Sequence, residues 1–224
     1  QVANVDVDGD GVISGPELSV SQVNNAGASP IDYDWGYTSY SLGANYLFTK
    51  DLGGFARISR GGRANADRLL FGVLLPDGSV RAEDAVDVVD QYEFGVKWRR
   101  DGFSLFATAF FTETEEQNYE LTSQRFLDRV YKARGIELEA SLRAGGFFAN
   151  GGLTWTDAEI SKDDISPTNE GNTPRRQADI VYQLTAGYAA SNWTVGANII
   201  GTSDAFAQDN NQLVFPAYSQ VNLF

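Results

Sequence analysis

The chain has 224 residues and a formal net charge of −13, from 17 Lys and Arg residues against 30 Asp and Glu residues. This excess of acid argues against nucleic acid as a partner, because phosphate contacts need clustered basic side chains. The chain contains neither Cys nor His, which excludes disulfides, thiolate or imidazole metal sites and the commonest general base.

The chain opens with an acidic segment, residues 1–33, that contains a calcium-loop pattern. Residues 6–17 match the twelve-residue EF-hand loop, with Gly11 at the sharp turn. The expected oxygen ligands are Asp6, Asp8, Asp10, the Val12 carbonyl, Ser14 and Glu17. Four closely spaced carboxylates repel one another unless a cation joins them, so the pattern predicts a structural Ca²⁺ site. The alternative is an acidic surface loop that matches by chance, because Gly27 and Pro30 leave little room for a following helix.

From residue 34 onward, apolar and polar residues alternate with the period of two that is typical of strands. In the segment 131–144, Ile136 and Leu138 share one face. Glu137 and Glu139 share the other. We predict nine strands of this kind, at 34–49, 54–60, 91–99, 103–112, 131–144, 147–158, 178–189, 193–202 and 213–224.

Short turns and long connections alternate between these strands. The short turns lie at 50–53, 100–102, 144–146 and 189–192, and the long connections at 61–90, 113–130, 159–177 and 203–212. Aromatic residues stand next to the short turns, at Phe48, Phe55, Trp98, Phe103, Phe147, Phe148, Tyr188 and Trp193. Aromatic girdles of this kind mark the two interfaces of a membrane.

The pattern predicts an all-β fold, an antiparallel transmembrane β-barrel. The chain has no run of about 18 apolar residues that could form a membrane-spanning helix. Its predicted strands reach about 10–14 residues, and about 9–11 tilted residues suffice to cross a bilayer. Long loops, including residues 1–33, are then expected outside the cell and short turns in the periplasm. A soluble β-sandwich or solenoid also shows polar-out alternation and stays open as the alternative.

An odd strand number is unexpected for a closed barrel, because bacterial single-chain barrels have even numbers. An open sheet in lipid would leave its edge N–H and C=O groups without partners. We therefore expect residues 34–224 to be part of a longer polypeptide.

The strand region resembles the C-terminal half of TonB-dependent outer-membrane receptors. The matching stretches are 34–48, 52–61, 93–97, 106–111, 131–139, 173–175 and 215–218. The most family-like is Gly-Ile-Glu-Leu-Glu at 135–139, with Tyr131 and Lys132 before it.

The resemblance implies a 22-stranded barrel, plugged by an N-terminal domain, that imports siderophore-iron, cobalamin or a glycan. It implies outer-membrane lipid and lipopolysaccharide as surroundings, and coupling to TonB through a region outside this chain. The stretch 215–218 precedes a final hairpin in the family, so the chain is expected to stop about two strands short. The competing interpretation is that Phe224 is the C-terminal aromatic residue of the barrel.

Other groupings admit a functional and a structural interpretation. Arg57, Arg60, Arg63 and Arg68 could bind an anionic ligand or lipopolysaccharide phosphates, but salt bridges to Asp67, Glu83 or Asp84 are the favoured interpretation. For Arg175 and Arg176 the same two interpretations apply, an anion site or salt bridges to Asp163 and Asp164. Trp35, Tyr37, Trp155 and Tyr119 could form a platform for a sugar, although interface anchoring is the commoner role.

The function that these features favour is TonB-dependent import across the bacterial outer membrane, with a Ca²⁺ site that stiffens an extracellular loop. Catalysis by Glu137 and Glu139 is not expected, since polar side chains are usual inside barrels. The alternative is a soluble or cell-surface β-rich binding module stabilised by calcium. A passive porin or an outer-membrane enzyme is a third possibility.

Overall fold

We describe the chain from a computed structural model. It describes residues 2–4, 6–7, 10–15, 17–19, 21–23, 36–64, 85–120 and 125–224. No helix among these residues is long and apolar enough to cross a membrane.

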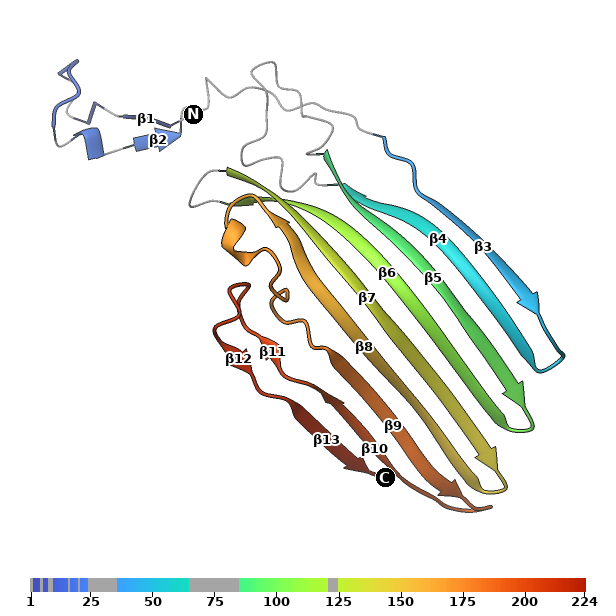
Figure 1. Cartoon of the computed structure of the whole chain (residues 1–224). Coiled ribbons are helices and arrows are strands. Elements are labelled where there is room, and N and C mark those ends of the chain that lie inside the picture. Colours follow the sequence, from blue (N-terminus) through green and yellow to red (C-terminus); the bar gives the residue numbers. More distant parts are fainter. Residues whose placement is uncertain are drawn as a thin grey trace.

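The main element is one antiparallel sheet of nine strands (Figure 1). Its strands are β3 (Tyr40–Leu47), β4 (Leu52–Ala64), β5 (Val86–Arg100), β6 (Phe103–Glu120), β7 (Arg125–Ala144), β8 (Phe147–Asp163), β9 (Ile180–Ala189), β10 (Thr194–Thr202) and β13 (Tyr218–Leu223). Each strand of the sheet is hydrogen-bonded to the strands that come before and after it among these nine. The two edge strands are β3 and β13. The sheet is therefore an up-and-down meander, as the turn pattern predicts.

Two small strand pairs and two 3₁₀ turns complete the described elements. The first pair joins β1 (Val2–Asn4) to β2 (Ser21–Val23), with η1 (Glu17–Ser19) between them in sequence. The second joins β11 (Ala205–Phe206) to β12 (Val214–Phe215), both within the connection between β10 and β13. The turn η4 (Pro167–Asn169) follows β8.

The strands near the middle of the sheet extend further toward the long loops than the alternation predicts. The strand predicted at 103–112 runs as β6 to Glu120, and the one predicted at 131–144 begins as β7 at Arg125. The connection predicted at 113–130 is correspondingly short. Charged residues such as Glu115 and Glu116 hide the period of two in this region. Backbone pairing between β6 and β7 continues beyond the apolar region regardless, because it does not depend on which side chains face lipid or water.

The strands at the two ends of the sheet are shorter than predicted. The strand predicted at 34–49 is regular only from Tyr40 to Leu47, and residues 34–35 lie outside the described residues. The strand predicted at 213–224 is divided into β12 and β13, with Pro216 between them. Proline cannot donate a hydrogen bond to the ladder, which accounts for the interruption.

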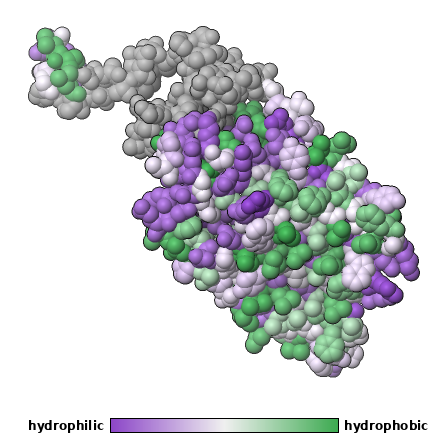
Figure 2. Space-filling view, viewed as in Figure 1, coloured by the Kyte–Doolittle hydropathy of each residue, from purple (hydrophilic) through white to green (hydrophobic). Residues whose placement is uncertain are grey.

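Direct register partners in an antiparallel pair point to the same side, so the register defines two faces. One row across β5 to β9 is apolar and consists of Val96, Ala107, Leu138, Leu153 and Tyr182. The next row points to the opposite side and consists of Lys97, Phe106, Glu139, Gly152 and Gln183. We call these the apolar face and the polar face. Figure 2 shows hydrophobic residues over the lower part of the strands and hydrophilic ones toward the loops at the top.

The short turns and their aromatic residues lie at one end of the sheet. The turn between β5 and β6 is built by Asp101 and Gly102, with φ of 42° and 83°, which suits a two-residue hairpin. Rings touch next to these turns: Trp98 lies 5.2 Å from Phe103 and Phe147 lies 4.8 Å from Tyr188, between centroids. The predicted aromatic girdle is therefore present at the short-turn end.

The sheet has almost no core of its own. Among the described residues, Ala85 and Ile160 are the buried hydrophobic ones, whereas Leu138, Leu142 and many other large apolar side chains are about 40% exposed or more. A soluble sandwich would bury one face of each sheet against the other. A single sheet with an exposed apolar face is instead the arrangement that a barrel wall in lipid requires.

Candidate functional site

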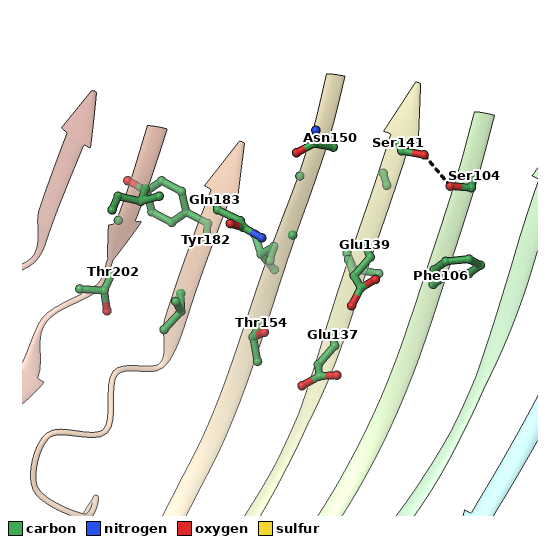
Figure 3. A pocket seen from close by; sticks show the side chains of 18 of the residues that line it. Ser104, Phe106, Glu137, Glu139, Ser141, Asn150, Thr154, Tyr182, Gln183 and Thr202 are labelled. Carbon is green, nitrogen blue, oxygen red and sulfur yellow. Dashed lines mark hydrogen bonds between the residues drawn. The ribbon is translucent and has the colours of Figure 1, made fainter. Parts of the chain in front are cut away.

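The polar face carries hydroxyl, amide and carboxylate groups on neighbouring strands. A hollow of about 700 Å³ lies over β6 to β10 and includes Glu137, Glu139, Asn150 and Gln183 (Figure 3). The side chains of Ser104 and Ser141, on paired strands, lie 2.7 Å apart within hydrogen-bond range. This surface can contact water, a polar ligand or another protein segment, but it is too open to exclude water.

Glu137 and Glu139, the carboxylates that the sequence singles out, both line this hollow. No hydrogen bond or ion pair within the described part of the chain joins either carboxylate to a partner.

Basic side chains on the polar face lie over aromatic rings near the short-turn end. Lys97 Nζ lies 4.7 Å from the centroid of the Phe55 ring, and the Arg99 guanidinium lies 6.0 Å from that of Phe106. Both distances are within the range of cation–π attraction. A second hollow, of about 630 Å³, includes Lys97, Arg99, Glu137 and Glu139. The alternation places Lys97 on the polar face but gives no signal for the ring contact of either basic residue.

The arginine cluster predicted at the base of the 61–90 connection forms ion pairs, but not with the predicted partners. Arg57 pairs with Glu93 at 2.7 Å, Arg60 with Asp90 at 2.8 Å and Arg63 with Asp87 at 3.0 Å. Each pair joins direct register partners on β4 and β5. The prediction ended β4 too early, so the acids on β5 were not expected to lie opposite these arginines. Arg68, Asp67, Glu83 and Asp84 lie outside the described residues.

The most buried polar group lies at the long-loop end, where Arg129 of β7 meets two aspartates. Arg129 Nη2 lies 2.8 Å from Asp163 at the end of β8, and Nη1 lies 3.0 Å from Asp209 in the β11–β12 connection. The side chains of Arg129, Asp163 and Asp209 are 11%, 0% and 10% exposed. We call these three residues the loop clamp.

A β-bulge aligns the loop clamp. Tyr131 pairs with Ile160, but Val130 pairs with Lys162, so Ser161 is the extra residue in β8. Because of this shift, Arg129 has Asp163 as its register partner and not the like-charged Lys162. The sequence predicted an ion pair between Asp163 or Asp164 and Arg175 or Arg176. In the structure Asp164 pairs with Lys162 at 3.1 Å. A bulge has no reliable sequence signal, so the pairing could not be foreseen.

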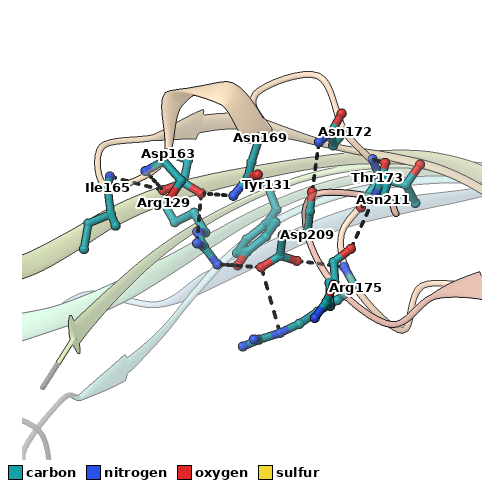
Figure 4. A network of polar contacts seen from close by, with 12 residues as sticks. Arg129, Tyr131, Asp163, Ile165, Asn169, Asn172, Thr173, Arg175, Asp209 and Asn211 are labelled. Carbon is teal, nitrogen blue, oxygen red and sulfur yellow. Dashed lines mark hydrogen bonds and ion pairs between the residues drawn. The ribbon is translucent and has the colours of Figure 1, made fainter. Parts of the chain in front are cut away.

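The loop clamp joins two long connections, 164–179 and 203–217, to the barrel strands (Figure 4). The Asn211 side chain accepts the Thr173 N–H at 3.0 Å and donates to the Thr173 carbonyl at 2.7 Å. Asp209 accepts the Arg175 N–H at 2.9 Å, and its carbonyl accepts the Asn172 amide at 2.9 Å. The two connections are thus hydrogen-bonded to each other. The connection 203–217 also binds Arg129 through Asp209, and the connection 164–179 binds Asp163.

Hydrogen bonds hold the Asp163 carboxylate in its charged form. Burial by itself would raise the pKa of this carboxyl group. The Ser166 N–H, the Asn169 amide and the Arg129 guanidinium outweigh that effect and lower the pKa below its ordinary value. Asp163 also accepts the Ile165 N–H, so it closes the turn after β8.

The calcium-loop pattern lies between β1 and β2 and not between two helices. The Glu17 side chain accepts the Val7 N–H and the Ser14 N–H, each at 2.7 Å, and Glu17 is 6% exposed. Asp6 accepts the Gly11 N–H at 2.8 Å, and Gly11 has a φ of 87°. Asp10 accepts the N–H of Val12, another predicted ligand, at 2.7 Å.

These contacts turn three predicted ligands, Asp6, Asp10 and Glu17, toward the backbone of their own loop. Asp8 lies outside the described residues. Among the residues that are described, no group of three or more acidic side chains is arranged to hold a metal ion. The oxygen donors match a calcium loop in residue type and in sequence spacing, and the site stays a prediction.

The aromatic residues suggested for a sugar platform do not gather at one site within the described residues. Trp155 is the register partner of Ile136 and Ile180, which places it on the apolar face. Tyr37 is half exposed beside Gly62. Trp35 and the side chain of Tyr119 lie outside what the structure describes. For Trp155, a position on the apolar face fits membrane anchoring better than sugar binding.

Comparisons with known proteins agree with this architecture. The family model described as "TonB dependent receptor-like, beta-barrel" matches residues 5–224. A search of curated proteins found no match.

Similar solved structures include three bacterial receptors. The ferric yersiniabactin uptake receptor of Yersinia pestis is 18% identical with a TM-score of 0.63, and 82% of this chain is covered. A siderophore receptor of Acinetobacter baumannii is 17% identical with a TM-score of 0.66 over 83% of this chain. The ferric-catecholate import receptor of K12 E. coli is 16% identical with a TM-score of 0.66 over 83%. In each case this chain spans 28% of the length of the other chain.

Proposed function

This chain belongs to the family of TonB-dependent receptor-like β-barrels, and we propose that it forms part of the wall and outer vestibule of an active nutrient importer. Its location is the bacterial outer membrane. The apolar face contacts lipid, and the polar face lines the lumen. The long-loop end faces the outside of the cell, and the short turns face the periplasm.

The observation that carries this proposal is the combination of a two-faced wall with clamped outer loops. A lumen wall needs polar groups that can exchange contacts with water, a plug or a passing ligand. Glu137, Asn150 and Gln183 supply such groups. The loop clamp holds two extracellular connections in a defined position at the mouth, where a ligand would first bind.

The imported ligand is a scarce nutrient of the siderophore-iron, cobalamin or glycan class. The names of the similar structures support the first of these, since all three are receptors for siderophores or their iron complexes. Energy would reach the barrel from TonB through an N-terminal region outside this chain. The role of this segment is binding and passage, not catalysis.

Uptake measurements test the importer. Cells that express the full polypeptide are given a panel of siderophores loaded with radioactive iron, with and without a functional TonB. The proposal predicts iron accumulation that requires both proteins. Accumulation that persists without TonB would instead indicate a passive pore.

We also propose that residues 6–17 bind Ca²⁺ and thereby stiffen the N-terminal extracellular segment. The support is the complete EF-hand pattern together with the inward-turned carboxylates of Asp6, Asp10 and Glu17. Extracellular calcium sites work at dissociation constants of about 0.1–1 mM. Removal of the cation would leave the repulsion among these carboxylates uncompensated.

Protease digestion of intact cells with and without a calcium chelator tests this site. In the wild-type protein, cleavage near residues 6–17 should increase when calcium is removed. The variant Glu17→Gln should be cleaved equally in both conditions, because the bidentate ligand is lost. Asp32→Asn, outside the pattern in the same acidic segment, is the control. A wild-type protein indifferent to calcium would contradict the proposal.

Lipid and lipopolysaccharide are the expected surroundings of the apolar face. At its extracellular border this face carries paired charges: Arg134 with Asp157 at 2.7 Å and Lys132 with Glu113 at 3.5 Å. These pairs mark the level at which the apolar band ends. They are compatible with contact to the head groups of the outer leaflet.

A further inference from the structure

The apolar face contains a groove along β7 and β8 that the proposed transport function does not use. Its volume is about 460 Å³. Small residues, Ala140, Ala149 and Gly151, form its floor, while Leu105 and Leu184 stand on its two sides. A Cβ atom added at Gly151 would lie 3.2 Å from Leu184, so even a methyl group would begin to fill the groove. The groove has the form and polarity to take an extended hydrocarbon chain.

The groove begins at the short-turn end. Phe103 lines it and immediately follows the Asp101–Gly102 turn. The register partner of Phe103 is Arg100, which places this arginine on the apolar face at the groove's periplasmic entrance. Arg100 Nε lies 3.5 Å from a carboxylate oxygen of Asp101. The Arg100 side chain is 66% exposed and that of Asp101 is 91% exposed. A pair this exposed contributes little, so the guanidinium remains available to a stronger anion.

Among the described basic residues near the short turns of β5 to β8, Arg100 is the one that the register places on the apolar face. Lys97 and Arg99 lie on the polar face, and so does Arg143, which is the register partner of Phe148. Guanidinium groups bind phosphate oxygens through paired hydrogen bonds.

We propose that this groove is a binding site for an anionic glycerophospholipid of the periplasmic leaflet. One acyl chain lies over Ala140, Ala149 and Gly151, and the phosphate contacts Arg100. The source is the inner leaflet, because the basic entrance is at the periplasmic end, whereas lipopolysaccharide occupies the opposite leaflet. The inference requires only the outer-membrane location and is independent of the imported ligand.

Native mass spectrometry of the full polypeptide in detergent tests the site, with phosphatidylglycerol and phosphatidylethanolamine as probes. Arg100→Gln should lower the affinity for phosphatidylglycerol about fivefold, as expected for the loss of one basic group near a membrane surface. It should lower the affinity for phosphatidylethanolamine less, because the ammonium group of that lipid offsets the charge of its phosphate. Arg100→Lys should retain most of the binding. Ala140→Leu, which fills the groove without changing charge, should weaken the binding of both lipids.

Two control variants separate a site from general attraction. Lys50→Gln removes a basic residue from another turn, and Ala109→Leu enlarges a residue of the apolar face outside the groove. Both should bind lipid as the wild type does. Equal losses in Lys50→Gln and Arg100→Gln would overturn the proposal, and so would wild-type binding by Ala140→Leu. Displacement of the bound phospholipid by lipid A would also overturn it.

Discussion

The three residues of the loop clamp decide how firmly the connections 164–179 and 203–217 are held. Asp163 is fully buried, and its charge is balanced by Arg129 and by backbone N–H groups. Removing one member of a buried ion pair leaves the other uncompensated and costs about 3–5 kcal/mol. An exposed pair contributes at most about 1 kcal/mol. In this chain Asp163 forms a buried ion pair, and the next residue, Asp164, forms an exposed one.

Asp163→Asn should therefore loosen both loops together, whereas Asp164→Asn should not. Asp164 is 50% exposed and pairs with Lys162, which is 45% exposed. Amide hydrogen exchange at Ser166 and Arg175 reports the opening. We expect exchange to accelerate by a factor of about 150 to 5,000 at both positions in Asp163→Asn, as the cost of about 3–5 kcal/mol for a broken buried pair implies. Faster exchange at only one of them would show that the loops are not coupled.

The same residue predicts a dependence on pH. The folded protein lowers the pKa of Asp163, so its carboxylate stabilises the loops above the ordinary aspartate pKa of about 3.9. That stabilisation is lost as pH falls below this value toward the lowered pKa. Exchange at Ser166 should thus be slow at neutral pH and rise below about pH 4. In Asp163→Asn this pH dependence should disappear.

At the scale of single elements, glycine and phenylalanine pair across the polar face. Phe55 faces Gly95, Phe110 faces Gly135 and Phe148 faces Gly187, each as direct register partners. A Cβ atom at any of these glycines would collide with the ring and with a backbone carbonyl of the next strand. The rings cover backbone that glycine would otherwise expose, and the glycines let the rings lie flat.

Gly135→Ala should accordingly destabilise the barrel by about 2 kcal/mol, as overpacking does. Its added Cβ would meet the Trp155 carbonyl oxygen and the Phe110 ring. Gly61→Ala is the matched control, because no atom lies within 4 Å of a Cβ there. The temperature at which the folded band disappears in unboiled SDS gels measures the difference. Equal temperatures for the two variants would contradict this account.

The strands and turns could be predicted from the sequence because apolar and polar side chains alternate where one face of a strand contacts lipid. The order of the nine strands and the short turns at 100–102 and 144–146 are confirmed. The ends of β6 and β7 could not be predicted, because strands that continue in water keep their pairing without alternation. The clamp partner of Asp163 depends on the bulge at Ser161, which no local pattern reveals.

At the scale of the whole molecule, charge is divided between the two ends. The segments 1–39, 61–90, 113–133, 159–179 and 203–217 contain 24 of the 30 acidic residues and 9 of the 17 basic ones. Their net charge is −15, so the remaining segments carry +2. The sequence therefore distinguishes an acidic long-loop end from a weakly basic wall and short-turn end. It does not identify a ligand, since ligand binding depends on how several loops come together.

Central to the proposed function is a nine-stranded wall with lipid on one side and a polar lumen on the other. This chain has no cysteine, and any cysteine elsewhere in the full polypeptide is first replaced by serine. Spin labels are then attached to single cysteines placed in turn at Ile136, Glu137, Leu138, Glu139 and Ala140. Their accessibility to oxygen, which concentrates in lipid, and to a water-soluble nickel complex is then measured in outer-membrane vesicles. The account predicts strict alternation, with positions 136, 138 and 140 accessible to oxygen and 137 and 139 shielded from lipid. Equal access to the nickel complex at all five positions would contradict it.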